Sequence, residues 1–186
     1  STLGEEKPED MGIGYGLRRL VAERARSARE AVEIAGALIE EFGYTSGRSY
    51  QFCDKNEAWV FQIPTGRRYV AKRIPDDHVY MIPNNYTIHE VDFADAEHKN
   101  CYFSKDLVEY AMKNGWYQPA VPGDYSDFDF ARAYQDGPDK VHNLIRARQT
   151  WPMLLGERPE EWRPFSRKAP RKYTVAELRR LLSSHF

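Results

Sequence analysis

The first apolar pattern along the chain repeats every three or four residues. Between Leu17 and Phe42 apolar side chains keep this spacing, with arginine and glutamate between them, and Gly43 follows directly. The periodicity predicts one long amphipathic helix that ends at Gly43, because glycine readily adopts the backbone conformation found after a helix. The charges of ERARSAREAVE then form its solvated face.

The pattern then changes to short segments rich in aromatic and β-branched residues. They are RSYQFCD at 48–54, EAWVFQI at 57–63, RRYVAKRI at 67–74 and VYMI at 79–82. Such segments, separated by Asp, Asn, Gly and Pro, predict β-strands joined by tight turns. EAWVFQI is apolar at both alternations, so we expect it to be covered on both faces, as in a layered structure.

The remaining periodic segments predict helices. They are KDLVEYAMKN after the cap residue Ser104, DFARAY, VHNLIRARQTW before Pro152, and a last helix that begins with the capping box of Thr174 and Glu177. The order of helix, strands and then mostly helices predicts an α+β fold, a single domain over residues 12–186. Residues 1–11 are polar and are expected to be a flexible N-terminal segment.

Composition and charge exclude several kinds of partner. The 186 residues include 27 basic and 28 acidic side chains, so there is no strongly basic character for binding nucleic acid. The apolar runs are too short and too interrupted by charge to cross a membrane. Residues 1–10, STLGEEKPED, have no apolar core of a secretory signal, and we expect a cytoplasmic protein.

Few residues are suited to covalent or metal chemistry. The two cysteines are far apart and the five histidines are scattered singly, so we expect no metal and no cofactor. Cys53 lies in a strand and is interpreted as a buried structural cysteine. Cys101 precedes a helix cap that could lower its pKa, but packing is again favoured. Ser1 could act as an N-terminal nucleophile only on an ordered first strand, and a chain boundary is preferred.

The stretch MIPNNYTI at 81–88 is the remaining candidate site. Pro83 ends the preceding strand, and Asn84 and Asn85 tolerate turn conformations while carrying amide groups that can donate to a carbonyl oxygen. From these residues alone a plain turn is favoured over a substrate-facing site.

The order of these segments resembles a known family. GLRRLVAERARSAREAVEIAGALIEEFGY, CDKNEAWVFQI, YVAKRIPDDHVYMIPNNYTI, SKDLVEYAMKNGWY and FDFARAY with IRARQ are similar to the middle of the dipeptidase A type of cysteine-nucleophile dipeptidases. The resemblance implies part of an αββα sandwich of the N-terminal-nucleophile hydrolases. It also implies hydrolysis of dipeptides, without a metal, by an N-terminal cysteine whose own α-amino group moves the proton.

The nucleophile of that family has no counterpart here, because neither Cys53 nor Cys101 matches its place. The resemblance therefore implies an incomplete piece of a larger hydrolase domain, which we expect to be inactive alone. IPNNYTI is similar to a Thr-Asn-x-Pro stretch of related bile-salt hydrolases and penicillin V acylases. That similarity implies that Asn84 is an oxyanion donor, with Asn85 as the adjacent alternative in contact with substrate.

A second similarity is less direct. PGDYSDFDFARA at 122–133 resembles a segment of those acylases that carries a site arginine, where this chain has Asp129. Either Asp129 binds substrate beside another cation, Arg146 or Arg148, or the similarity reflects packing only; packing carries at least equal weight.

The rival hypothesis is a non-catalytic α+β binding or assembly domain, in which Asn84 and Asn85 form only a turn. A partial sandwich would also leave apolar sheet surface uncovered, which favours a homo-oligomer.

Overall fold

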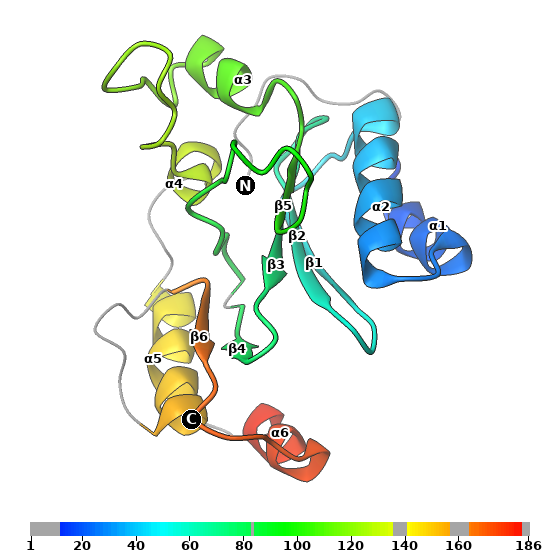
Figure 1. Cartoon of the computed structure of the whole chain (residues 1–186), viewed down its shortest axis with the longest axis vertical. Coiled ribbons are helices and arrows are strands. Elements are labelled where there is room, and N and C mark those ends of the chain that lie inside the picture. The colour runs from blue at the N-terminus through cyan, green and yellow to red at the C-terminus, as the bar shows by residue number, and fades with distance from the viewer. Residues whose placement is uncertain (1–11, 83, 136–140, 157–163, 184–186) are drawn as a thin grey trace.

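Antiparallel strands form two sheets with helices on both sides (Figure 1). The computed structural model describes residues 12–82, 84–135, 141–156 and 164–183. The helices are α1 (Gly16–Arg24), α2 (Ala28–Phe42), α3 (Leu107–Lys113), α4 (Phe130–Tyr134), α5 (Val141–Leu155) and α6 (Val175–Leu182). The strands are β1 (Arg48–Cys53), β2 (Ala58–Ile63), β3 (Val70–Ile74), β4 (His78–Tyr80), β5 (Cys101–Phe103) and β6 (Ser166–Lys168).

The larger sheet has the order β1-β2-β3-β5, and β4 pairs with β6 in a second sheet. Tyr50 lies opposite Phe61 in the β1–β2 pair, and Phe61 lies opposite Ala71 in the β2–β3 pair. Every residue of β2 from Trp59 to Ile63 is buried. The prediction that this strand is covered on both faces is therefore confirmed.

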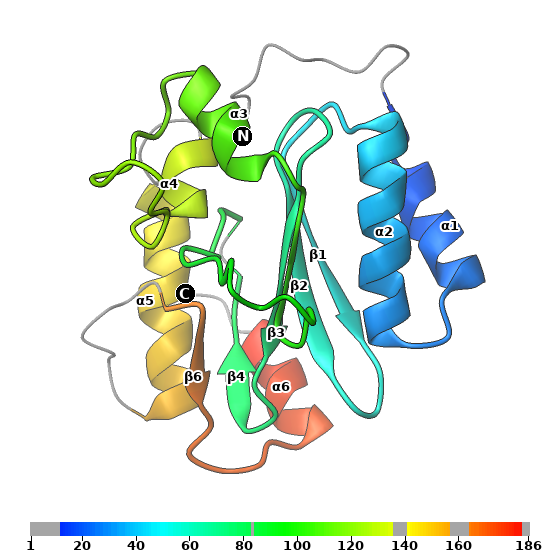
Figure 2. The same ribbon diagram turned by 45° about the horizontal axis from the view of Figure 1, so that its top comes forward.

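The two faces of the larger sheet belong to different cores, because side chains alternate along each strand. Trp59, Phe61 and Ile63 pack against α1 and α2, and the ring of Phe61 stacks on Tyr69 at 4.8 Å. Val60 faces the other core, which includes residues of α3 and α4. Figure 2 shows α2 against one face of the sheet, and α3 and α4 on the other side.

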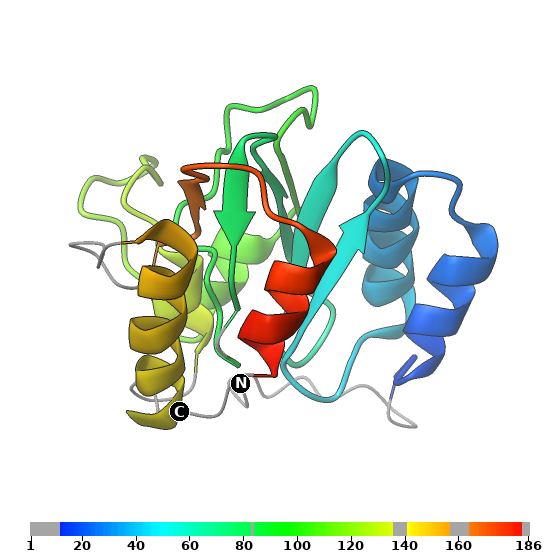
Figure 3. The same cartoon turned by 90° about the horizontal axis from the view of Figure 1, so that it is seen from below.

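The layers can be followed from below in Figure 3. Helices α1 and α2 come first, then the larger sheet, then β4 with β6, and then α5. The α+β prediction is confirmed, and this order agrees with part of an αββα sandwich. That residues 12–186 form one domain stays a prediction, and residues 1–11 lie outside the described part of the chain.

The prediction of one long helix before Gly43 is wrong, because the chain breaks between α1 and α2. Ser27 is extended and its side chain accepts a hydrogen bond from the backbone N–H of Glu30 at 3.1 Å. The Glu30 carboxylate accepts from Arg26 N at 2.7 Å, and Asp54 accepts from Ala28 N at 2.8 Å. The bonds from Ala28 N and Glu30 N satisfy free N–H groups in the first turn of a new helix, so α2 starts separately.

Two further expectations need correction. Helix α5 does not stop before Pro152 but continues to Leu155, where Gly156 N donates to Pro152 O at 2.8 Å. Trp151 and Leu154 are buried, and their packing offsets the hydrogen bond that proline cannot donate. Strand β4 spans only His78–Tyr80, and the three-residue strands β5 and β6 were not predicted.

The expected uncovered apolar surface on a sheet is not found among the described residues. Within them, the large apolar side chains that are exposed lie on helices or connecting segments and not on strands. The described strands thus expose no large apolar side chain of the kind expected to favour self-association, and a homo-oligomer stays a prediction. None of the described helices combines the length and apolar character needed to cross a bilayer.

Candidate functional site

Asn84 lies where the chain turns back on itself after β4. The hydroxyl groups of Tyr80 and Thr87 are 3.1 Å apart, so the two arms of this turn lie side by side. Asn84 is exposed and has a φ of 38°, in the left-handed region that asparagine tolerates better than most residues. Asn85 is half-buried, and its Nδ2 donates to Tyr86 O at 3.4 Å. The predicted turn is present, although Pro83 itself lies outside the described residues.

Residues 86–90, which we call the support segment, form the second arm of this turn and are held against β2. The buried side chain of Gln62 makes the contact: its Oε1 accepts from Thr87 N at 3.2 Å and from Ile88 N at 3.0 Å. Its Nε2 donates to Ser49 Oγ at 3.1 Å and to Thr87 Oγ1 at 3.2 Å. The backbone that follows the asparagines is therefore bonded to the centre of the sheet.

The support segment is held from its other side by α4. Tyr86 N donates to Gln135 Oε1 at 3.1 Å, and Phe130 N donates to His89 O at 2.9 Å. The Tyr86 hydroxyl also donates to Ile63 O at 2.7 Å, next to Gln62 on β2. The segment thus lies between a strand and a helix, with hydrogen bonds to both.

Asp129 is bonded within the fold. Its carboxylate caps α4 by accepting from Arg132 N at 2.8 Å and accepts from His89 Nδ1 at 2.9 Å. Burial acts to raise the pKa of Asp129, but the bonds from His89 and the Arg132 backbone outweigh it and lower that pKa below its usual value. These contacts account for an aspartate here without a ligand.

Asp129 and Asn84 lie near opposite ends of the support segment. Gln135, at the C-terminal end of α4, meets Tyr86, whereas Asp129, at its N-terminal end, meets His89. A substrate contact of Asp129 stays a prediction, while its carboxylate is already bonded to His89 and Arg132. The geometry favours the packing interpretation of PGDYSDFDFARA.

The proposed cations lie on α5. Arg146 and Arg148 are both exposed there.

The environments of the two cysteines are unfavourable for a nucleophile. Cys53 is exposed at the end of β1, so its prediction as a buried cysteine is wrong. Burial of part of the side chain and the neighbouring Asp54 raise the pKa of Cys53. Cys101 is buried as expected, and burial raises its pKa to about 11. Both thiols are therefore protonated at neutral pH, and the thiolate is the form that attacks a carbonyl.

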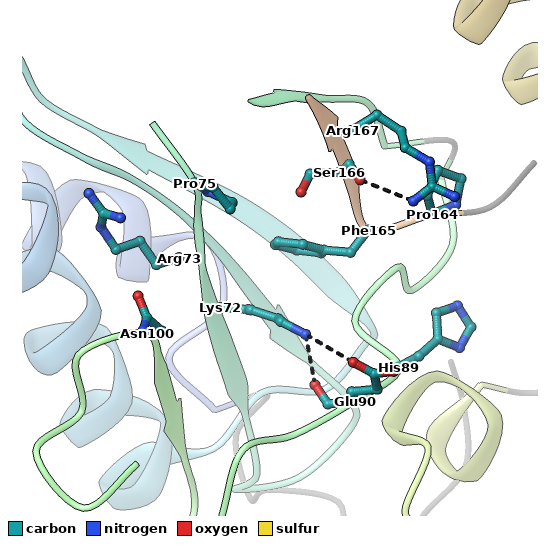
Figure 4. A pocket seen from close by; sticks show the side chains of 10 residues that line it. All are labelled: Lys72, Arg73, Pro75, His89, Glu90, Asn100, Pro164, Phe165, Ser166 and Arg167. Carbon is teal, nitrogen blue, oxygen red and sulfur yellow. Dashed lines mark hydrogen bonds and ion pairs between the residues drawn. The ribbon is translucent and has the colours of Figure 1, made fainter. Parts of the chain in front are cut away.

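A cleft of about 490 Å³ opens beside β3 and β6 (Figure 4). It is lined by Lys72, Arg73, Pro75, His89, Glu90, Asn100, Pro164, Phe165, Ser166 and Arg167. Lys72 donates to the backbone oxygen of Glu90 at 3.3 Å, and Arg73 pairs with Glu57 at 3.3 Å. Lys72 and Arg73 thus already have partners within the fold. Asn84 is not among the residues that line the cleft. The cleft therefore adjoins the end of the support segment at His89 and Glu90 and does not reach the turn at Asn84.

Gln62 is a residue of the site that the apolar pattern of its strand conceals. The segment EAWVFQI is apolar at most positions of both alternations, and Gln62 is the polar exception on the face opposite Phe61. A polar side chain within a strand covered on both faces needs hydrogen-bond partners, and that requirement was a signal available in the sequence. Among the described residues no group of His, Cys, Asp and Glu side chains could hold a metal ion.

Known proteins resemble this chain over nearly its whole length. The chain is 30% identical over 173 residues to a probable dipeptidase of Latilactobacillus sakei, which covers 90% of this chain and 35% of that protein. It is 30% identical over 204 residues to a dipeptidase of Bifidobacterium longum, covering 98% of this chain and 37% of the relative. It is 31% identical over 193 residues to a probable dipeptidase B of Lactococcus lactis, covering 99% of this chain and 39% of that protein. The chain thus spans less than two fifths of each relative's length.

The resemblance to cysteine-nucleophile dipeptidases is confirmed by these relatives and by the family comparison. The sequence model of peptidase family C69 matches residues 5–186. The chain belongs to peptidase family C69.

Proposed function

We propose that the full-length protein hydrolyses the peptide bond of dipeptides, with Asn84 as an oxyanion donor. The relatives named as dipeptidases support this substrate class. The observation that carries the role of Asn84 is its place at an exposed turn whose following residues are bonded to both β2 and α4. An oxyanion donor must be held in place before the reaction, since reorganisation would reduce its benefit.

The chemistry proceeds by acyl transfer. A cysteine thiolate attacks the carbonyl carbon, the carbonyl oxygen becomes an oxyanion, and the C–N bond then breaks to release the amine and leave a thioester. The α-amino group of that cysteine takes the thiol proton and passes it to the leaving amine, and water later hydrolyses the thioester. The side-chain N–H of Asn84 would donate to the oxyanion in both steps.

The nucleophile in this proposal is a cysteine outside these 186 residues. The raised pKa values of Cys53 and Cys101 argue against either residue in that role. We therefore expect the 186-residue chain alone to be inactive. Dipeptide turnover by the purified chain that persists when Cys53, Cys101 and Asn84 are all replaced would contradict the mechanism.

The decisive experiment replaces Asn84 by alanine in the full-length protein. Loss of one oxyanion donor lowers kcat by about 10²–10³-fold, so the variant should lose this much dipeptide turnover at a temperature where it is folded. Its Tm should fall only modestly, because alanine tolerates the left-handed backbone less well than asparagine. Asn56, an exposed asparagine between β1 and β2, supplies the matched control, and Asn56→Ala should retain nearly all of kcat. Asn85→Ala tests the alternative donor. If Asn84→Ala leaves turnover intact, or loses activity only in proportion to its unfolded fraction, Asn84 is a turn residue and the binding or assembly domain becomes the better hypothesis.

A further inference from the structure

Gln62 is an unusual residue for the centre of this sheet. Its side chain is 0% exposed, as are those of its neighbours Phe61 and Ile63. Burying an amide is unfavourable unless its polar atoms find partners, and an apolar side chain avoids this cost. Gln62 has partners on both its oxygen and its nitrogen, in four hydrogen bonds. Such a satisfied buried group fixes one arrangement of the groups around it.

The two ends of the Gln62 amide have different partners. Its Oε1 accepts from two consecutive backbone N–H groups, those of Thr87 and Ile88. Backbone N–H groups can only donate, so the oxygen must be the atom that faces them. The Nε2 group in turn faces two hydroxyl groups, those of Ser49 and Thr87. The oxygen therefore determines where the support segment lies, three residues after Asn84.

We infer that Gln62 is a positioning residue for the oxyanion donor, acting through the support segment on Asn84. This inference rests on the proposed role of Asn84. The path is short: the Gln62 oxygen holds Thr87 N, and Tyr86 is held in addition by Gln135 and by Ile63 O. Only Asn85 then separates the fixed backbone at Tyr86 from Asn84. When the Gln62 oxygen is removed, β2 no longer bonds to the backbone of the support segment at Thr87 and Ile88.

The test uses the full-length enzyme with Gln62→Met, which keeps the length and flexibility of the side chain but removes its hydrogen bonds. A displacement of about 1 Å at a catalytic group can cost up to about a hundredfold, so we expect kcat to fall between tenfold and a hundredfold with little change in KM. Ser49→Ala is the matched control, because it removes one partner of Nε2 and leaves both bonds of Oε1. It should retain nearly all of kcat.

A second variant keeps the test valid if Gln62→Met folds poorly. Gln62→Glu retains an acceptor oxygen of the same reach and should recover most of the kcat lost in Gln62→Met. A kcat loss in Gln62→Met with no recovery in Gln62→Glu would contradict a role for the oxygen. All rates are compared at a temperature below the lowest Tm of the series, where each variant is folded.

The double variant Gln62→Met with Asn84→Ala distinguishes positioning from a general effect on the fold. If Gln62 acts through Asn84, the double variant is no slower than Asn84→Ala alone, because the group being positioned is already absent. If the two losses multiply, the inference is wrong. If Asn84→Ala lowers kcat while Gln62→Met does not, the inference fails and the proposed function stands. If Asn84→Ala has no effect, the proposed function fails and any loss in Gln62→Met has another cause.

Discussion

Replacing Asp129 by alanine is expected to destabilise the fold and leave substrate affinity unchanged. The substitution removes the cap of α4, in which Arg132 N donates to the carboxylate at 2.8 Å, at a cost of about 1 kcal/mol. It also removes the bond from His89 Nδ1 at 2.9 Å. Because the Asp129 side chain is 36% exposed, solvent screening reduces that second contribution to about 1 kcal/mol. The free energy of unfolding should therefore fall by about 2 kcal/mol.

Urea unfolding followed by tryptophan fluorescence measures this loss. With a slope of about 2 kcal/mol per molar urea, the midpoint of Asp129→Ala should lie about 1 M lower than that of the wild type. Asp129→Asn is the matched control, because asparagine caps helices nearly as well as aspartate while losing the charge. Its midpoint should shift by about half as much. An unchanged midpoint, together with a raised KM in the full-length enzyme, would refute this reasoning and place Asp129 against substrate.

The pH dependence of the same variant provides a second check. The pKa of Asp129 is lowered in the folded state, so its stabilisation is present above the unfolded-state value of about 4. It is lost as the pH falls further, through the lower folded-state pKa. The difference in midpoint between wild type and Asp129→Ala should therefore narrow below about pH 4. A difference that stays constant down to pH 2 would contradict the bonded carboxylate.

A glycine substitution and the reactivity of the two thiols test the packing of the surrounding fold. A Cβ on Gly36 would lie 2.5 Å from Tyr69 Cζ. Gly36→Ala should therefore destabilise by about 1–3 kcal/mol despite a better helix propensity, whereas Gly16→Ala, whose nearest neighbour would be 3.9 Å away, should not; equal urea midpoints would contradict this packing. A thiol reagent should modify exposed Cys53 in the native protein and buried Cys101 only after unfolding, and equal rates for both would show that the burial is wrong.

The sequence predicts elements well where local pattern and packing agree. EAWVFQI predicted a covered strand because its apolar residues occupy both faces, and the structure buries Trp59 to Ile63. The prediction of one long helix is wrong for an identifiable reason. The three- and four-residue apolar spacing continues across Ser27, so it conceals the break between α1 and α2. The Ser-x-x-Glu pattern of Ser27 and Glu30 was the local signal that a new helix begins.

Short strands could not be predicted because their partners are distant in sequence. β5 exists through its pairing with β3, and β6 through its pairing with β4, as in the pair of Tyr80 with Ser166. Three residues carry too little pattern to indicate a strand by themselves. Cys53 was placed incorrectly for a related reason: β1 is at the edge of the sheet, and composition alone does not distinguish an edge strand from a central one.

The candidate site also has a part that local sequence predicts and a part that depends on distant residues. The turn at Asn84 follows from local residues, since asparagine suits a left-handed backbone. The hydrogen bonds that hold the support segment do not follow from local residues, because Gln62 is 25 residues before Thr87 and Gln135 is 49 residues after Tyr86. These contacts bear on the choice between a plain turn and an oxyanion donor. A turn alone gains little from a buried amide in an apolar strand, because an apolar side chain would pack there without the cost of desolvation. A donor that must point at one developing charge gains from every bond that fixes its backbone, and the hydrogen bonds from β2 and α4 provide that restraint.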